Sequence, residues 1–148
     1  MKIRAVETEA PILQKLPSTD DWQYTASWRC VIRTKADGDF VVRIMPGYKT
    51  DLASVPKALR GAFDNGSGSL GVLVASQVHD MFYSTHYTSR DFADNLFRLL
   101  LRWYGVGRFK SELYYLAVHL FGADPWDRGE KHLDRDRQLC GFDWVDRA

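Results

Sequence analysis

Apolar and polar residues partly alternate along two short stretches in the first third of the chain. Residues 28–34 and 40–45 are enriched in β-branched side chains, and an Asp-Gly turn signal lies between them. This pattern predicts a β-hairpin. Because successive side chains of a strand point to opposite faces, we expect Trp28, Cys30 and Ile32 to face the core.

The middle of the chain has the longer period that is typical of helices. Apolar residues recur at helical spacing over residues 70–83, and a second helix is expected to begin near Thr88 or Ser89. The third helix is predicted over about 108–121 and ends before Gly122, which we expect to be a left-handed cap. Its predicted core stripe consists of Phe109, Leu113, Leu116, Ala117 and Leu120.

Together these elements predict an α+β fold, in which an N-terminal β-hairpin or small antiparallel sheet packs on a three-helix core. We expect residues 1–123 to form a single domain. The remaining residues, 124–148, are strongly charged and contain few apolar anchors. We interpret them as a charged C-terminal extension that packs lightly or meets a protein partner.

Composition and charge narrow the range of functions. The chain has 148 residues, of which 45% are hydrophobic, and this is enough for one core. Its formal net charge of +1 gives no broad attraction to nucleic acid or to an anionic membrane, so neither is expected as a partner. Cys30 and Cys140 lack metal-type spacing and are expected to be reduced thiols of a cytoplasmic protein.

A series of polar residues interrupts the apolar pattern. An expected extended loop contains Asp51 and Ser54, and the apolar first helix contains the doublet His79-Asp80. Asp94 lies at the edge of the apolar stripe of the second helix. We expect these side chains to share one polar site.

The residue types at this site suit a divalent cation. The carboxylates provide the hard oxygen ligands that such ions prefer, and the imidazole provides one nitrogen ligand of intermediate softness. A bound cation lowers the pKa of its water and creates a hydrolytic nucleophile. The predicted catalytic and metal-binding residues are Asp51, His79, Asp80 and Asp94.

The same residues also fit a purely structural network. Buried polar groups must be hydrogen-bonded whether or not they catalyse a reaction, so Asp80 can bind the loop while His79 is a hydrogen-bonded core residue. Asp51 can close a turn of the loop. The histidines expected to be solvated are His86, His119 and His132.

Arg90, Ser54 and Tyr83 are the candidate substrate-binding residues, with Arg90 holding an anionic group. Each has a structural alternative. Arg90 can pair with Asp94, four residues later on the same helix. Ser54 can cap a short helix that begins near Pro56, and Tyr83 can belong to the core.

Four motifs, GYKTDLASVP, HDMFY, SRDFADNLF and LYYLAVHLFG, follow one another between residues 46 and 122. In this order and spacing they resemble the DUF1353 family, a set of small uncharacterised proteins of bacteriophages, prophages and bacteria. The family pattern falls on the candidate residues above and on Gly122, and His119 stands where a basic residue such as Arg is expected. The resemblance implies a phage or prophage origin and a shared site, without an established activity.

Two functions from different classes follow from the sequence. The first is a metal-dependent hydrolase in the cytoplasm of a bacterial host. The second is a non-catalytic phage protein, either a virion component of tail or head or a host-directed protein-binding module. In the second case the polar residues pin the loop to the helices, and the extension around Trp126 and Trp144 contacts the partner.

Overall fold

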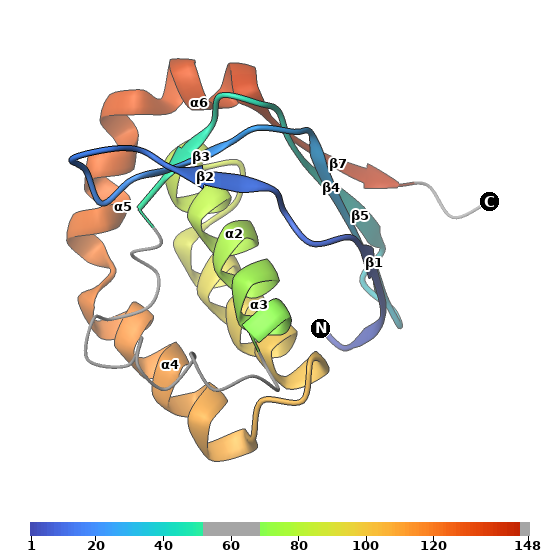
Figure 1. The fold of residues 1–148 in the computed structure, drawn as a ribbon. Coiled ribbons are helices and arrows are strands. Elements are labelled where there is room, and N and C mark those ends of the chain that lie inside the picture. Colours follow the sequence, from blue (N-terminus) through green and yellow to red (C-terminus); the bar gives the residue numbers. More distant parts are fainter. Residues whose placement is uncertain (52–68, 146–148) are drawn as a thin grey trace. The chain divides into compact units, whose positions relative to one another are not determined.

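The computed structural model describes residues 1–51 and 69–145 and divides the chain into two compact units. One unit combines Met1–Asp51 with Asp134–Ala148, and the other is Leu52–Leu133. Strands dominate the first unit and helices the second (Figure 1). The combination of antiparallel sheets and helices confirms the α+β class.

A four-stranded antiparallel sheet forms most of the first unit. Its strands β1 (Ile3–Thr8), β4 (Trp28–Thr34), β5 (Asp39–Ile44) and β7 (Cys140–Val145) lie in the order β1-β4-β5-β7. The predicted hairpin is confirmed, because β4 pairs with β5.

The two central strands are buried more completely than simple alternation predicts. Cys30 and Ile32 are buried as expected, but so is Val31, which points to the other face. On the face of Ile32, which pairs with Phe40, the Phe40 ring lies 5.6 Å from that of Phe142 and 5.2 Å from that of Trp144. The alternation is incomplete because Val31 is buried on the face of β4 that also carries the exposed Arg29 and the half-buried Arg33.

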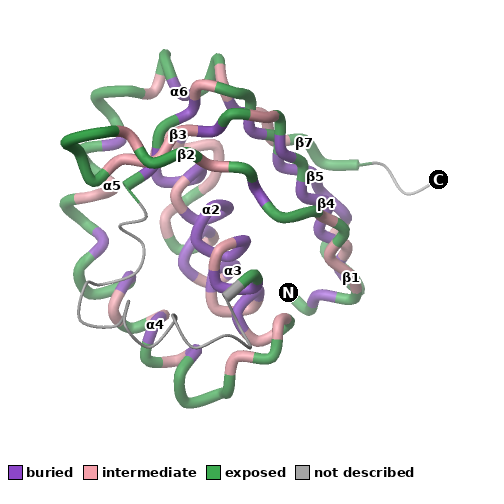
Figure 2. Tube along the Cα trace, in the orientation of Figure 1, coloured by how far each residue is buried: buried purple, intermediate pink, exposed green. Residues whose placement is uncertain are grey.

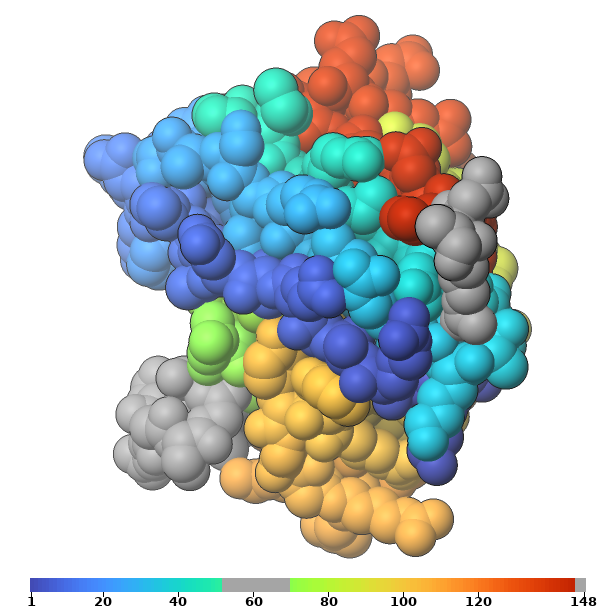
Figure 3. All heavy atoms as spheres, turned by 90° about the vertical axis from the view of Figure 1, so that its right-hand side faces the viewer, coloured from blue at the N-terminus to red at the C-terminus, as the bar shows by residue number. Residues whose placement is uncertain are grey.

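The charged C-terminal region contributes a strand, β7, to the four-stranded sheet. After α6 (Leu133–Leu139), β7 pairs with β5 along its whole length, from Cys140 opposite Ile44 to Val145 opposite Asp39. Figure 3 shows red C-terminal atoms beside the cyan to teal atoms of the region around β5, although the two are far apart in the sequence. Residues 140–145 thus complete the sheet.

A second, three-stranded sheet belongs to the same unit. Its short strands β2 (Leu13–Lys15), β3 (Trp22–Tyr24) and β6 (Lys49–Thr50) pair antiparallel in the order β2-β3-β6. Strand β6 occupies the start of the segment that was predicted to be an extended loop. Strands of two or three residues leave too little alternation to be detected from sequence.

The second unit contains the three predicted helices, α2 (Ser69–Thr85), α3 (Arg90–Trp103) and α4 (Arg108–Phe121), followed by α5 (Ala123–Gly129) and η1 (Glu130–His132). Helix α2 packs on α3, and α3 packs on α4. Figure 2 shows that α2 is buried along most of its length and that buried and intermediate residues alternate along α3. The start of α3 is fixed by Ser89, whose hydroxyl accepts a hydrogen bond from the Phe92 amide at 3.1 Å.

The prediction for the core face of α4 was wrong. Phe109, Leu113, Leu116 and Leu120 are exposed, whereas the buried residues of this helix are Ser111, Tyr114 and Val118. The buried side of α4 includes a polar contact, in which the guanidinium of Arg102 on α3 donates to the Ser111 hydroxyl at 3.2 Å. A helical period shows that an apolar stripe exists, but it does not show what covers the stripe.

One prediction concerns the buried carboxylate of Asp39 in the first sheet. Its oxygens accept hydrogen bonds from Arg4 at 2.9 Å, from Arg33 at 3.3 Å and from the Thr34 amide at 3.0 Å. Burial alone would raise the pKa of Asp39, but these donors outweigh it and lower the pKa. A lowered folded-state pKa stabilises the fold above the unfolded-state pKa, and this stability is lost as the pH falls through the folded-state value.

We therefore expect Asp39→Asn to unfold more easily at neutral pH and to lose less stability than the wild type below about pH 4. Urea unfolding measured at several pH values tests this expectation. The exposed turn residue Asp20 provides the control variant, Asp20→Asn. If the wild type and Asp39→Asn lost the same amount of folding stability on acidification, the lowered pKa of Asp39 would be contradicted.

Candidate functional site

Three of the predicted polar residues meet inside the helical unit. His79 and Tyr83 lie one turn apart on α2, so both face Asp94 on α3. The His79 Nε2 atom lies 2.7 Å from Asp94 Oδ1, and the Tyr83 hydroxyl donates to the same oxygen at 2.7 Å. The site is thus built around one carboxylate oxygen that two side chains of the neighbouring helix contact.

The second oxygen of Asp94 has a different environment. Asp94 Oδ2 is buried and has no hydrogen-bond partner among the residues that the structure describes. It faces two nitrogens at 3.7 Å, Arg90 Nε and His119 Nδ1. The predicted ion pair between Arg90 and Asp94 is present, at a distance longer than a direct hydrogen bond.

Arg90 connects this cluster to the end of α4. Its Nε atom donates to the Tyr83 hydroxyl at 3.3 Å, and its guanidinium also donates to the backbone carbonyl of His119. A cation at the C-terminal end of a helix is favourable, since the unpaired carbonyls there carry partial negative charge. Arg90 therefore holds the carboxylate, the phenol and the last turn of α4 together.

Burial determines the protonation states at the site. The exposed fractions are 0% for Asp94, 2% for His79 and 7% for Tyr83. Burial lowers the pKa of His79 by more than the Asp94 carboxylate raises it, so the imidazole is neutral at neutral pH. Burial and the bond to Asp94 raise the pKa of Tyr83, which keeps the phenol protonated and donating.

Aromatic rings surround the cluster. The His79 ring lies 4.1 Å from the Tyr83 ring and 5.0 Å from the Phe97 ring, while Trp126 of α5 meets Tyr83 edge-on at 5.2 Å. Trp126 also stacks on His86, with 3.8 Å between the ring centroids and an interplanar angle of 4°. The rings enclose the polar groups in apolar surroundings.

Two of the three histidines expected to be solvated have specific contacts. His86 is half-buried, and its Nε2 lies 3.0 Å from the Trp126 carbonyl. His119 is exposed as expected, yet its ring reaches Asp94. Only the sequence resemblance pointed to His119, by placing it where a basic residue is expected. His132 is exposed.

The remaining predicted site residues are distributed differently. Asp80 follows His79 on α2 and is half-buried, and it points about 100° away around the helix axis. Asp51 is exposed and belongs to the other unit, and Ser54 lies outside the described residues. Among residues 1–51 and 69–145, no group of three or more His, Cys, Asp or Glu side chains is arranged to hold a metal ion.

Two glycines allow the helices to approach the site closely, which the sequence analysis did not foresee. A Cβ atom on Gly122 would lie 2.4 Å from the Tyr83 hydroxyl and 2.2 Å from the Val118 carbonyl oxygen. A Cβ on Gly129 would lie 2.0 Å from the Tyr83 carbonyl oxygen. Gly122 has φ of −85°, so the prediction of a left-handed cap was wrong. The absence of a side chain is what this position requires.

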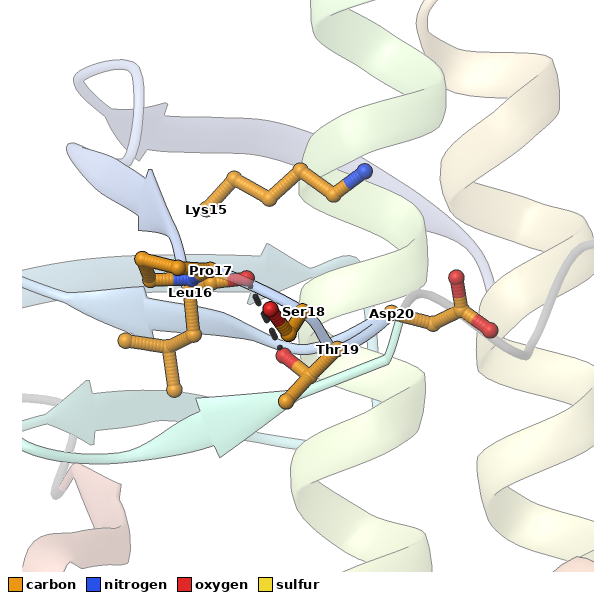
Figure 4. A pocket seen from close by; sticks show the side chains of 6 residues that line it. All are labelled: Lys15, Leu16, Pro17, Ser18, Thr19 and Asp20. Carbon is orange, nitrogen blue, oxygen red and sulfur yellow. Dashed lines mark hydrogen bonds between the residues drawn. The ribbon is translucent and has the colours of Figure 1, made fainter.

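A surface hollow of about 490 Å³ lies in the first unit, and none of the predicted site residues lines it. It is lined by the turn between β2 and β3, from Lys15 to Asp20. Figure 4 shows that the Leu16 side chain points away from those of Lys15 and Asp20. The hydrogen bond from the Thr19 hydroxyl to the Leu16 carbonyl, 3.1 Å long, stabilises the turn itself. The hollow therefore does not resemble a site built around a ligand.

The sequence model of the DUF1353 family, described as proteins of unknown function, matches residues 21–118. This match covers more than half of the chain, so the protein belongs to the DUF1353 family. It includes β3, β4 and β5 as well as α2, α3 and most of α4. No curated protein and no solved structure matches the chain. None of the described helices is both long enough and apolar enough to cross a membrane.

We expect Gly122→Ala to lower the free energy of unfolding by about 1–3 kcal/mol, because the added methyl group must displace the Tyr83 hydroxyl or the backbone. Gly107→Ala is the matched control, since nothing lies within 4 Å of the Cβ position at Gly107. Its cost should stay below about 1 kcal/mol. Urea unfolding of both variants measures the difference, and equal losses would contradict the close approach.

Proposed function

We propose that this protein is a hydrolase in which His79 acts as the general base and Asp94 holds the imidazole in place. The observation that supports this proposal is the buried contact between His79 Nε2 and Asp94 Oδ1, at 2.7 Å. A histidine oriented by a carboxylate is a recurrent arrangement for taking a proton from water or from a hydroxyl nucleophile.

The hydrogen bonds define which nitrogen of His79 can take the proton. A carboxylate accepts hydrogen bonds and cannot donate them, so the hydrogen of the neutral imidazole lies on Nε2, facing Asp94. The Nδ1 atom is then an acceptor, and any group next to it must donate. A water at Nδ1 would give its proton to the ring as its oxygen attacked the substrate, and Asp94 would stabilise the imidazolium that forms.

Tyr83 and Arg90 position Asp94 in this proposal. The Tyr83 hydroxyl occupies a second acceptor direction of Asp94 Oδ1, so the carboxylate cannot rotate without losing a hydrogen bond. Arg90 supports Tyr83 through its Nε atom and faces the other oxygen of Asp94. The proposed binding of an anionic substrate by Arg90 would have to use the part of the guanidinium left exposed by these contacts.

A divalent cation remains part of the proposal. One ion bound by all of Asp51, His79, Asp80 and Asp94 would have to replace the hydrogen bond between His79 and Asp94. A cation on Asp80 would leave that bond intact, because Asp80 points in another direction from the same helix. Such an ion would supply Lewis-acid polarisation of a substrate oxygen.

The non-catalytic alternative is a phage virion component of tail or head, or a host-directed binding module. It is supported by the fact that the contacts of Asp94 Oδ1 are all made inside one unit, as a stabilising network requires. In that case His79 contributes only to the stability of the fold, and replacing it does not change any hydrolysis rate. Family membership is compatible with both functions, as is a place in a bacterial host cytoplasm or in a virion.

The hydrolase proposal is tested with two chromogenic probes, p-nitrophenyl acetate and bis(p-nitrophenyl) phosphate, assayed with and without Mg²⁺, Mn²⁺ or Ca²⁺. We expect His79→Gln to lower the hydrolysis rate by about 10²–10⁴, as the loss of a general base does. The exposed His132 supplies the control, His132→Gln, which should keep the wild-type rate. A wild-type rate no higher than that of folded His79→Gln on both probes would favour the non-catalytic alternative.

Calorimetric titration of the metal-stripped protein with Mn²⁺, Mg²⁺ and Zn²⁺ tests the cation separately. We expect binding that is lost in Asp80→Asn, because that carboxylate is proposed to supply ligand oxygens. Asp127→Asn, at an exposed position of α5, is the control for the loss of one negative charge. Binding that survives Asp80→Asn unchanged, or no binding by the wild type, would remove the cation from the proposal.

A further inference from the structure

The outer face of α4 carries a regular row of exposed apolar side chains. Phe109, Leu113, Leu116 and Leu120, here called the outer stripe, are exposed by 82%, 42%, 47% and 66%. The residues of α4 that are buried, Ser111, Tyr114 and Val118, lie on the opposite side of the helix. The outer stripe is therefore turned away from the face of α4 that carries its buried residues.

The spacing of the outer stripe favours another helix as the partner. Its residues follow one another at intervals of four, three and four, which is the 3.5-residue repeat of the a and d positions in a two-helix seam. A helix packed along this row would contact every stripe residue. We propose that the partner is α4 of a second copy of this chain, packed antiparallel, so that Phe109 meets Leu120 of the other copy.

The charges at the two ends of α4 specify the antiparallel direction. Its first turn contains Arg108 and Lys110 and no acidic residue, although the N-terminal end of a helix favours negative charge. In an antiparallel pair this basic turn lies beside the C-terminal end of the partner helix. That end carries the negative pole of the helix dipole and is followed by the exposed Asp124. A parallel pair would instead place the two basic turns together.

The size of the stripe indicates a reversible dimer. Its exposed side chains amount to roughly 400–500 Å² per copy, compared with about 800 Å² per partner in a standard stable interface. Contacts between two identical patches form a closed two-fold pair and stop at the dimer. We therefore expect a monomer–dimer equilibrium that depends on protein concentration.

Sedimentation equilibrium of the full chain, from low micromolar to several hundred micromolar, tests the association. We expect a dimer at the upper end, and we expect Leu116→Glu to weaken dimerisation by about tenfold or more, because it places a charge near the centre of the seam. Ile12→Glu is the matched control, since Ile12 is 60% exposed and lies in the other unit. Circular dichroism confirms that both variants are folded.

Disulfide formation tests the direction of pairing. When Phe109→Cys and Leu120→Cys are mixed and oxidised, an antiparallel pair gives the mixed disulfide, whereas a parallel pair gives disulfides between copies of the same variant. The native Cys30 and Cys140 are buried and compete little with these exposed thiols. Disulfides between copies of one variant would overturn the antiparallel arrangement.

Two results would overturn the proposal as a whole. One is a monomer at every concentration, including a monomer that sediments with anionic phospholipid vesicles through the outer stripe, since the partner would then be a lipid surface. The other is a dimer that Leu116→Glu leaves unchanged, because its interface would then lie elsewhere. Neither result bears on the hydrolysis assay, so this proposal and the proposed function are tested independently.

Discussion

The helical unit depends on keeping one buried carboxylate supplied with hydrogen-bond donors and positive charge. A buried, isolated carboxylate is strongly unfavourable, so Asp94 requires partners at fixed positions. Two of these partners, His79 and Tyr83, lie on α2 and contact the carboxylate directly. The other two are Arg90, four residues before Asp94 on α3, and His119 of α4. A shift of any of the three helices would leave part of this charge uncompensated, which makes the carboxylate a reference point for their packing.

The tight packing around Tyr83 follows from the same requirement. A phenol that donates to a buried carboxylate has to be held in place along its whole length, by Trp126 against the ring and by the backbone at Gly122 near the hydroxyl. Gly129 lies close to the backbone carbonyl of Tyr83. The glycines therefore belong to the environment of the site, although neither offers a functional group.

Local patterns were sufficient to predict the hairpin, the three helices and the proximity of His79 to Asp94, whereas Tyr83 was expected either to bind substrate or to belong to the core. His79 and Tyr83 are polar or amphipathic residues one turn apart in an apolar helix, and Asp94 borders an apolar stripe, so each needed a buried partner. The catalytic and metal-binding roles of these residues stay predictions, and so do those of Asp51 and Asp80.

Other features depend on contacts between distant parts of the chain and left no clear local signal. The partner of β7 cannot be inferred from residues 140–145 alone, because an edge strand can pair with many sequences. The covered side of α4 carries Ser111, Tyr114 and Val118, while apolar periodicity favoured the opposite side. Gly122 and Gly129 have neither a left-handed backbone nor a turn motif, so the sequence does not indicate that they allow a close approach to Tyr83.

The order of the elements along the chain has a consequence for folding. The pairing of Asp39 with Val145 joins the two ends of a segment that contains the whole helical unit. Closing so long a loop costs conformational entropy while the intervening chain is unfolded. This entropy cost decreases once the intervening chain is compact. During synthesis the helical unit can fold as soon as it has emerged, whereas β5 has to wait for the last strand. The edge of β5 is thus exposed to pairing with other chains until β7 has been synthesised.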